Sequence, residues 1–250
     1  MIKPLVAGNW KMHGSTEKAS NLAAQLAEQW GDNLAVEMVL FPPFVHLSAV
    51  KAAVANTGIA VGAQNISQHS SGAYTGEISG AMLVDQGCDY VLVGHSERRE
   101  LFSESNQTVA EKFKAAQDVG LTPILCVGES LQQRQQEQTL DVVAAQIAAV
   151  IDCVGLSNVC RAVIAYEPVW AIGTGLTASP AQAQEVHQAI RAHVAAVAPE
   201  QARGLKILYG GSVTAASAEE LFAQADIDGG LVGGASLQAD SFLAIGQAAK

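Results

Sequence analysis

Short apolar segments alternate with longer segments of helical periodicity along the whole chain. Eight of the apolar segments read as strands, and several of them lack the polar alternation of a half-exposed strand. They therefore predict strands buried on both faces of a parallel sheet. By number they are residues 5–8, 36–41, 59–63, 90–93, 123–127, 162–166, 206–209 and 230–232. Eight strand–helix alternations are what a closed α/β barrel requires, so we predict a single (β/α)8 barrel with an outer ring of helices.

The clearest helix signal begins at Ser179. This serine supplies an N-cap, Pro180 suits the first turn, and Gln182 completes a capping box. One apolar stripe follows at helical spacing, formed by Val186, Ile190, Val194 and Val197. No linker rich in Pro, Gly or Ser divides the 250 residues, so we expect one domain over residues 1–250.

Residues 64–79 interrupt the strand–helix rhythm. The segment is rich in Ser, Gly and His, which makes it too polar for the core, and it is too long for an ordinary connection. Loops of this length are commonly functional or interfacial.

Composition and charge narrow the function classes. The chain is 49% hydrophobic and 15% charged, a composition typical of a folded soluble protein. Its formal net charge of −10 argues against binding to nucleic acid or anionic membranes. An anionic small substrate would instead be held by main-chain N–H groups, which glycine-rich turns at Gly210-Gly211-Ser212 and Gly233-Gly234 can offer.

The cysteines and the absence of targeting patterns suggest a compartment. Cys88, Cys126, Cys153 and Cys160 show no paired CxxC spacing, so neither a disulfide framework nor a zinc site is indicated. The sequence has no apolar run long enough to span a membrane, and its first residues lack the pattern of a signal peptide. We expect a cytoplasmic protein.

The run from Ala165 to Gly175 carries the most chemical information. It places Glu167 at the end of an apolar strand and follows it with a loop that starts at Pro168 and ends in glycines. Such a loop can hinge at both ends and close over the carboxylate. A single glutamate at a strand end is most often a solvated or ion-paired surface group, so further evidence is needed.

Three other motifs supply that evidence. Gly8-Asn9-Trp10-Lys11, Val93-Gly94-His95-Ser96-Glu97-Arg98-Arg99 and Tyr209-Gly210-Gly211-Ser212-Val213 each follow an apolar, strand-like run. Together with Glu167 and its loop, and in this order, they resemble the triosephosphate isomerase family over the whole chain. The resemblance implies a TIM barrel that interconverts dihydroxyacetone phosphate and D-glyceraldehyde 3-phosphate through an enediolate, in glycolysis and gluconeogenesis, without a metal or organic cofactor.

The resemblance also implies a role for each matching residue. Glu167 would be the base, His95 a neutral electrophile, and Asn9 and Lys11 the polar contacts of the substrate. Main-chain N–H groups at Gly173, Ser212, Gly233 and Gly234 would hold the phosphate. The lid would comprise Pro168, Val169, Trp170, Ala171, Ile172, Gly173, Thr174, Gly175, Leu176, Thr177 and Ala178. Leu176 stands where some members of the family have lysine, which we expect to tune lid motion.

Supporting residues and a partner subunit follow in the same way. Glu97 is a candidate neighbour of Lys11, Cys126 is expected to pack behind the site, and Tyr209 precedes the phosphate turn. Ser96 could cap the short helix after His95, whose N-terminus would disfavour a charged imidazole. The segment Gly72–Glu77 looks like the family's dimer loop, with Thr75 reaching towards the site of a second subunit in a homodimer.

Other interpretations have less support. The G-x-G-x-x-A pattern from Gly173 to Ala178 lacks the strand context and the acidic residue of a dinucleotide site. A non-catalytic phosphosugar-binding barrel would not need both Glu167 and His95. An aldolase would need a Schiff-base lysine at a strand end, whereas Lys206 begins its strand. An isomerase of a larger phosphorylated sugar is a further alternative.

Overall fold

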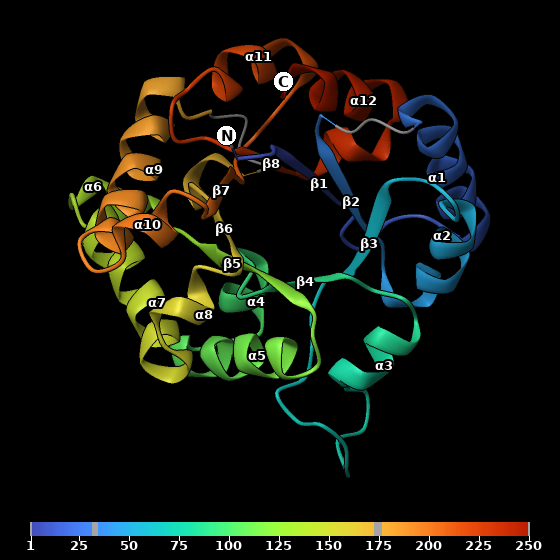
Figure 1. Ribbon diagram of the computed structural model, residues 1–250, viewed down its shortest axis with the longest axis horizontal. Coiled ribbons are helices and arrows are strands. Elements are labelled where there is room, and N and C mark those ends of the chain that lie inside the picture. Colours follow the sequence, from blue (N-terminus) through green and yellow to red (C-terminus); the bar gives the residue numbers. More distant parts are fainter. Residues whose placement is uncertain (1, 32–34, 173–176, 250) are drawn as a thin grey trace.

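Eight parallel strands close into a barrel in the computed structural model, which describes residues 2–31, 35–172 and 177–249 (Figure 1). The strands pair in chain order, and β8 pairs with β1 to complete the ring. Their bounds are β1 (Leu5–Asn9), β2 (Glu37–Phe41), β3 (Ile59–Ala63), β4 (Tyr90–Val93), β5 (Thr122–Val127), β6 (Val163–Tyr166), β7 (Lys206–Tyr209) and β8 (Gly229–Val232). The predicted barrel is confirmed, and each predicted strand matches or differs by one residue at one end.

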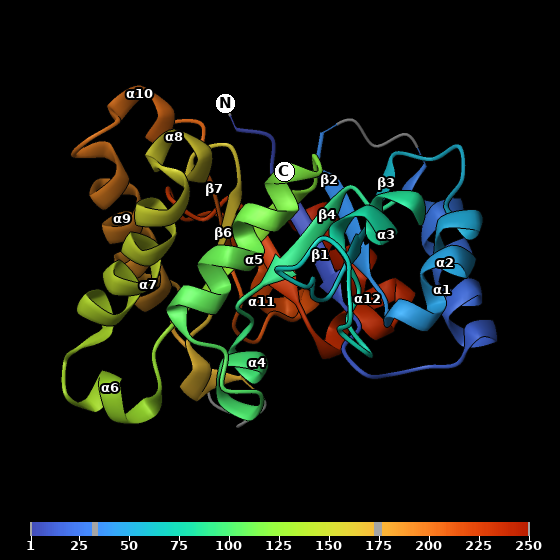
Figure 2. The ribbon, with the colours of Figure 1, turned by 90° about the horizontal axis from the view of Figure 1, so that it is seen from below.

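Helices surround the barrel on all sides (Figure 1). They are α1 (Thr16–Trp30), α2 (Leu47–Ala53), α3 (Gly80–Asp85), α4 (Ser96–Leu101), α5 (Asn106–Asp118), α6 (Leu131–Gln135), α7 (Thr139–Val154), α8 (Leu156–Val159), α9 (Pro180–Ala195), α10 (Pro199–Ala202), α11 (Ala215–Phe222) and α12 (Ala239–Ala248). Three 3-10 turns are η1 (Phe44–His46), η2 (Val169–Ala171) and η3 (Gly234–Leu237). In Figure 2 the chain ends lie at the top, and α4 and α6 lie at the opposite end.

Two apolar layers explain why the strands are hydrophobic on both faces. Alternate residues such as Leu5, Ala7 and Val39 fill the inside of the barrel. Their neighbours, such as Val6 and Leu40, pack outwards against the helices. Because successive side chains of a strand point to opposite faces, both sets are buried and no polar alternation remains in the sequence.

Local signals fix where the helices begin. Ser179 accepts a hydrogen bond from the Gln182 amide, and the Gln182 side chain accepts one from the Ser179 amide, so the predicted capping box before α9 is confirmed. Side-chain caps of the same kind precede other helices, formed by Ser15, Ser79, Ser105, Ser130 and Thr214. These caps mark the residues at which the preceding connections end and the helices begin.

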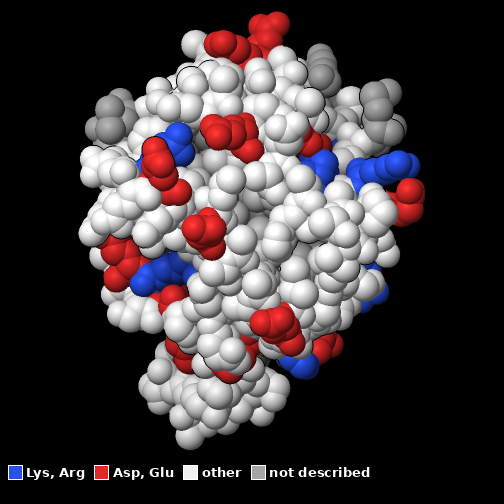
Figure 3. Space-filling view, turned by 90° about the vertical axis from the view of Figure 1, so that its left-hand side faces the viewer, with Lys and Arg blue, Asp and Glu red and all other residues white. Residues whose placement is uncertain are grey.

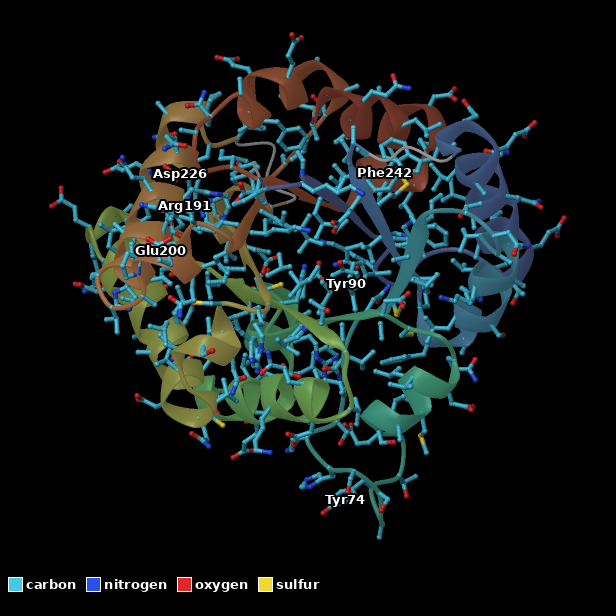
Figure 4. All side chains as sticks on the ribbon, in the orientation of Figure 1. Tyr74, Tyr90, Arg191, Glu200, Asp226 and Phe242 are labelled. Atoms are coloured by element: carbon cyan, nitrogen blue, oxygen red, sulfur yellow. The ribbon has the colours of Figure 1, made fainter. Side chains whose placement is uncertain are left out.

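Residues 64–79 project from the barrel between β3 and α3 (Figure 1). Tyr74 lies near the tip of this projection, where its ring stacks on His69 at a centroid distance of 3.8 Å (Figure 4). The projection at the lower end of Figure 3 shows mostly uncharged surface. No helix in the described ranges is both long and apolar enough to cross a membrane.

Candidate active site

Glu167 lies directly after β6, at the carboxyl end of the barrel, and its residue is 2% exposed. Its Oε2 atom accepts a hydrogen bond of 2.9 Å from the Ser96 amide, and its Oε1 atom lies 3.0 Å from His95 Nε2. Burial raises the pKa of this carboxyl. His95, the Ser96 amide and Lys11 lower the pKa by more than burial raises it, so it lies below its ordinary value. The site therefore holds an ionised carboxylate away from water.

His95 follows β4 and faces Glu167 across the mouth of the barrel. Its Nδ1 atom accepts a hydrogen bond of 3.3 Å from the Glu97 amide, which leaves Nε2–H as the donor towards Glu167. Burial lowers the pKa of His95, whereas the Glu167 carboxylate raises it and prevails. The Glu97 amide acts against protonation, because Nδ1 can accept this bond only while it carries no proton.

The expected capping role of Ser96 is wrong. The short helix α4 begins at Ser96 itself, and the cap is His95, whose ring nitrogen accepts from the Glu97 amide. An imidazole can take this role because its Nδ1 lone pair lies within reach of the second amide of the helix. The Ser96 amide is thereby left to bind Glu167.

Lys11 approaches the same cavity from β1. Its backbone has φ of +50°, a left-handed conformation that costs energy for a residue with a side chain. The Lys11 amide donates a hydrogen bond of 3.0 Å to Asn9 Oδ1. The Lys11 ammonium lies 2.5 Å from the Glu97 carboxylate, so the expected neighbours do meet. Gln64 donates to the Lys11 carbonyl at 2.8 Å and holds this unusual turn in place.

A cavity of about 430 Å³ connects these groups to the glycine-rich turns. Its walls include the side chains of Asn9, Lys11, His95 and Glu167, together with the turns that contain Ser212, Gly233 and Gly234. Gly233 caps η3, so main-chain groups at the start of this turn face the cavity. The volume suits a small molecule, and the turns offer N–H groups to an anion.

The comparisons with known proteins agree with this geometry. A family model described as triosephosphate isomerase matches residues 4–249. Proteins named triosephosphate isomerase from Dechloromonas aromatica and Thiobacillus denitrificans are 55% and 57% identical to the chain, over 100% of it and over 100% and 99% of their own lengths. A protein of that name from Pseudomonas paraeruginosa is 56% identical over 100% of the chain and 99% of its own length. The chain belongs to the triosephosphate isomerase family.

The loop predicted as a lid begins with the 3-10 turn η2, directly after Pro168. Trp170 donates from its indole nitrogen to Glu129 Oε1 at 3.0 Å, and the Arg134 guanidinium stacks over the Trp170 ring. Ser212 Oγ donates to the Ala171 carbonyl at 2.9 Å, which ties the turn to the phosphate side of the cavity. The lid residues Gly173, Thr174, Gly175 and Leu176 lie outside the described residues, as does the proposed Gly173 phosphate contact.

The supporting residues surround this centre. Cys126 is fully buried inside the barrel, where burial raises the pKa of its thiol, so it packs as an apolar residue. Tyr209 is also fully buried, on the outer face of β7. Thr75 is exposed on the projecting loop and is not part of the cavity within this chain. No group of three or more metal-binding side chains was found among the residues that the structure describes.

Sequence reasoning missed two residues that organise the site. Glu129 Oε1 accepts from Tyr166 at 3.1 Å as well as from Trp170, so one buried carboxylate joins the strand before Glu167 to the lid. The sequence signal for Glu129 is its position two residues after the apolar strand β5, at the carboxyl end of the barrel. Gln146 was the other, and its signal is a polar residue within the apolar stripe of α7.

Proposed function

We propose that Glu167 is the base, and His95 with Lys11 the electrophilic groups, of an isomerisation of a phosphorylated triose. The chain is an isomerase, and its reaction interconverts dihydroxyacetone phosphate and D-glyceraldehyde 3-phosphate in glycolysis and gluconeogenesis. One observation supports this assignment above all others. A buried, ionised carboxylate and an imidazole N–H face each other across 3.0 Å at the wall of a cavity of about 430 Å³.

Two proton transfers at carbon complete the reaction, together with the passage of one proton from the hydroxyl oxygen of the substrate to its former carbonyl oxygen. Glu167 takes a proton from the carbon beside the carbonyl, and the electron pair of the broken C–H bond forms the enediolate. His95 Nε2–H and the Lys11 ammonium stabilise the negative charge that develops on oxygen. The protonated Glu167 then returns its proton to the neighbouring carbon, so one base serves both steps.

The carboxylate has to change its contacts for this chemistry. In the free protein it is held by the Ser96 amide and His95, and a substrate must come between Glu167 and the imidazole. His95 then donates to the substrate oxygen instead of to Glu167. Because Glu167 raises the pKa of His95 more than any other group does, its separation favours the neutral ring that the mechanism needs.

The phosphate contacts and the lid complete the proposed site. Main-chain groups at Ser212, Gly233 and Gly234, together with Gly173, hold the phosphate. Closure of residues 168–178 excludes water while the enediolate exists, which protects it from loss of phosphate. All of the proton transfers use groups of the chain itself, so we assign no metal or organic cofactor.

We also propose a cytoplasmic homodimer in which residues 1–250 act as one domain. Large apolar side chains are exposed in three of the connections that follow strands, namely Met12 after β1, Tyr74 on the projecting loop after β3, and Phe102 after β4 and α4. A partner subunit that covered these side chains would remove apolar surface from water. Residues 64–79 would dock beside the partner's site, with Thr75 facing its Lys11 and His95.

A coupled assay tests the function. The purified chain should convert dihydroxyacetone phosphate to D-glyceraldehyde 3-phosphate and catalyse the reverse reaction. A phosphosugar-binding barrel would bind both compounds without turnover. An aldolase would be inactivated by borohydride in the presence of substrate, because reduction traps its Schiff base. Either result, or turnover of a larger phosphorylated sugar alone, would contradict the proposal.

A further inference from the structure

Gln146 stands out because it is a polar side chain on the buried face of a helix. The buried residues of α7 are Val143, Gln146, Ile147 and Val150, which repeat at helical spacing. Gln146 is only 9% exposed, and it lines a second cavity of about 670 Å³ that also borders Glu167. An amide in such a place needs hydrogen-bond partners, because a buried polar group without them costs free energy.

Both partners of Gln146 belong to a single residue. The Gly128 amide donates to Gln146 Oε1 at 2.8 Å, and Gln146 Nε2 donates to the Gly128 carbonyl at 3.0 Å. Strand β5 ends at Val127, one residue earlier. The Gln146 side chain thus takes the place of a neighbouring strand and satisfies Gly128 just after the regular sheet has ended.

Gly128 in turn lies against the backbone of the base. A Cβ atom at Gly128 would come within 1.8 Å of the Glu167 carbonyl oxygen, a distance that no side chain can adopt. The hydrogen bonds on either side run in the same direction. The Glu167 amide donates to the Val127 carbonyl at 2.7 Å, and the Val169 amide donates to the Glu129 carbonyl at 3.2 Å.

We propose that Gln146 is a positioning residue for catalysis, which fixes the Gly128 peptide and through it the backbone of Glu167 and the first turn of the lid. The inference rests on the proposed function of Glu167. Gln146 itself touches neither the substrate cavity nor the reacting atoms. Its effect passes through the two peptide groups between Val127 and Glu129, a segment that contacts both the base and the loop after it.

The chemistry of the pair restricts what can replace the amide. Methionine has a similar length and shape, but it would leave a buried N–H and a buried C=O of Gly128 without partners. Glutamate can reproduce both bonds while protonated, because its carbonyl accepts and its hydroxyl donates. Once ionised, it would set a negative oxygen against the Gly128 carbonyl and repel it.

The first test is Gln146→Met, with kcat and inhibition by inorganic phosphate measured in one preparation. We expect kcat to fall roughly 10- to 100-fold, because small misplacements of a catalytic group have effects of that size. The inhibition constant of phosphate should stay within about twofold, since neither Gly128 nor Gln146 lines the cavity that contains the phosphate turns. Gln117→Met is the matched control, because Gln117 is a helical glutamine whose amide donates to the Asn158 carbonyl, and both residues lie before strands β5 and β6, at the amino end of the barrel.

The second test is Gln146→Glu, compared with the wild type at each pH. The ratio of the two kcat values should lie near one at low pH and fall by about tenfold or more as the pH rises through the pKa of the new carboxyl, which burial raises. Gln117→Glu should show no such pH-dependent ratio. This variant also serves if Gln146→Met fails to fold, because the charge at position 146 is then changed by pH alone, within one folded protein.

The outcomes separate this inference from the proposed function. Gln146→Met with kcat within twofold of the wild type would overturn it, as would a parallel loss of phosphate binding or a pH-independent ratio for Gln146→Glu. A wild-type chain without isomerase activity, or a fully active Glu167→Gln variant, would instead overturn the role of Glu167. An inactive Glu167→Gln beside a normal Gln146→Met would refute only the positioning role.

Discussion

Two carboxylates, Glu167 and Asp226, show how the two ends of the barrel differ. Asp226 lies before β8, at the amino end of the strands, where Arg191 Nε and Gln184 Nε2 each donate to it at 2.6 Å. His187 Nδ1 lies 3.1 Å from the Asp226 carbonyl oxygen. These three partners are spaced at helical intervals along one face of α9, and Figure 4 shows Arg191 beside Asp226.

Glu167 is held in a different way. Its two oxygens contact the Ser96 amide and His95, both from the segment after β4, and they border a cavity of about 430 Å³. A substrate entering that cavity can replace these contacts, whereas nothing can enter between Asp226 and α9 without separating the helix from the barrel. The contacts at the amino end of the barrel therefore stabilise the fold, whereas those at the carboxyl end form the candidate active site.

The largest expected effect is the loss of the base. Glu167→Gln keeps the shape of the side chain and can still accept from the Ser96 amide, but it cannot take up a proton at neutral pH. Turnover should fall by about 10²- to 10⁴-fold or more, while inhibition by inorganic phosphate stays unchanged. Steady-state kinetics and a phosphate inhibition series measure both. Turnover near the wild-type value would remove Glu167 from the mechanism.

The next effect concerns the projecting loop at the same end. Thr75→Arg should prevent residues 64–79 from docking and yield monomers, with activity lower by roughly 100-fold because the site geometry would be disturbed. Sedimentation velocity and turnover should be measured on the same sample. Lys250→Arg, a conservative change at the C-terminal residue, serves as the control. A fully active monomer would show that the loop has another purpose.

A smaller effect, on stability alone, is expected at the amino end. Asp226→Asn removes the charge that pairs with Arg191 and should lower the free energy of unfolding by about 1–3 kcal/mol. Asp228 still accepts from Arg191 at 2.7 Å, so the cost stays below that of an unpaired buried cation. Thermal unfolding measures the loss, and kcat at 25 °C should stay within twofold of the wild type. A fall in kcat of more than twofold with an unchanged Tm would contradict the distinction between the two ends.

The smallest effect is a pH dependence from His187. Burial lowers the pKa of this ring to about 4 in the folded protein, below its ordinary 6.5. The unfolded chain therefore binds a proton first, so the contribution to stability is complete above pH 6.5 and is lost as the pH falls towards 4. At pH 5.5 the loss is about 1 kcal/mol. Unfolding curves of the wild type and His187→Gln should differ in slope over this range, and parallel curves would contradict the assignment.

The sequence could predict the elements that local patterns determine. Strands such as Ile59–Ala63 are marked by apolar runs, and α9 is marked by its capping box. The candidate residues Asn9, Lys11, His95 and Glu167 could be placed together because each follows a strand, and the carboxyl ends of parallel strands meet at one rim.

The remaining features depend on contacts between distant segments. Nothing near His95 in the sequence shows that its ring nitrogen caps α4, because the choice depends on where the Ser96 amide finds Glu167. The role of Gln146 likewise requires a bond across 18 residues to Gly128. Such pairings appear only when the barrel brings the segments together.

Hydrogen exchange at the substrate carbon tests the role of Glu167 most directly. With dihydroxyacetone phosphate in deuterium oxide, the wild type should place deuterium on the carbon that loses its proton, and NMR or mass spectrometry of the recovered triose phosphates will detect it. Glu167→Gln should show no exchange above the uncatalysed rate, even at substrate concentrations that saturate the variant. Exchange by that variant at a rate near the wild type would show that another group removes the proton.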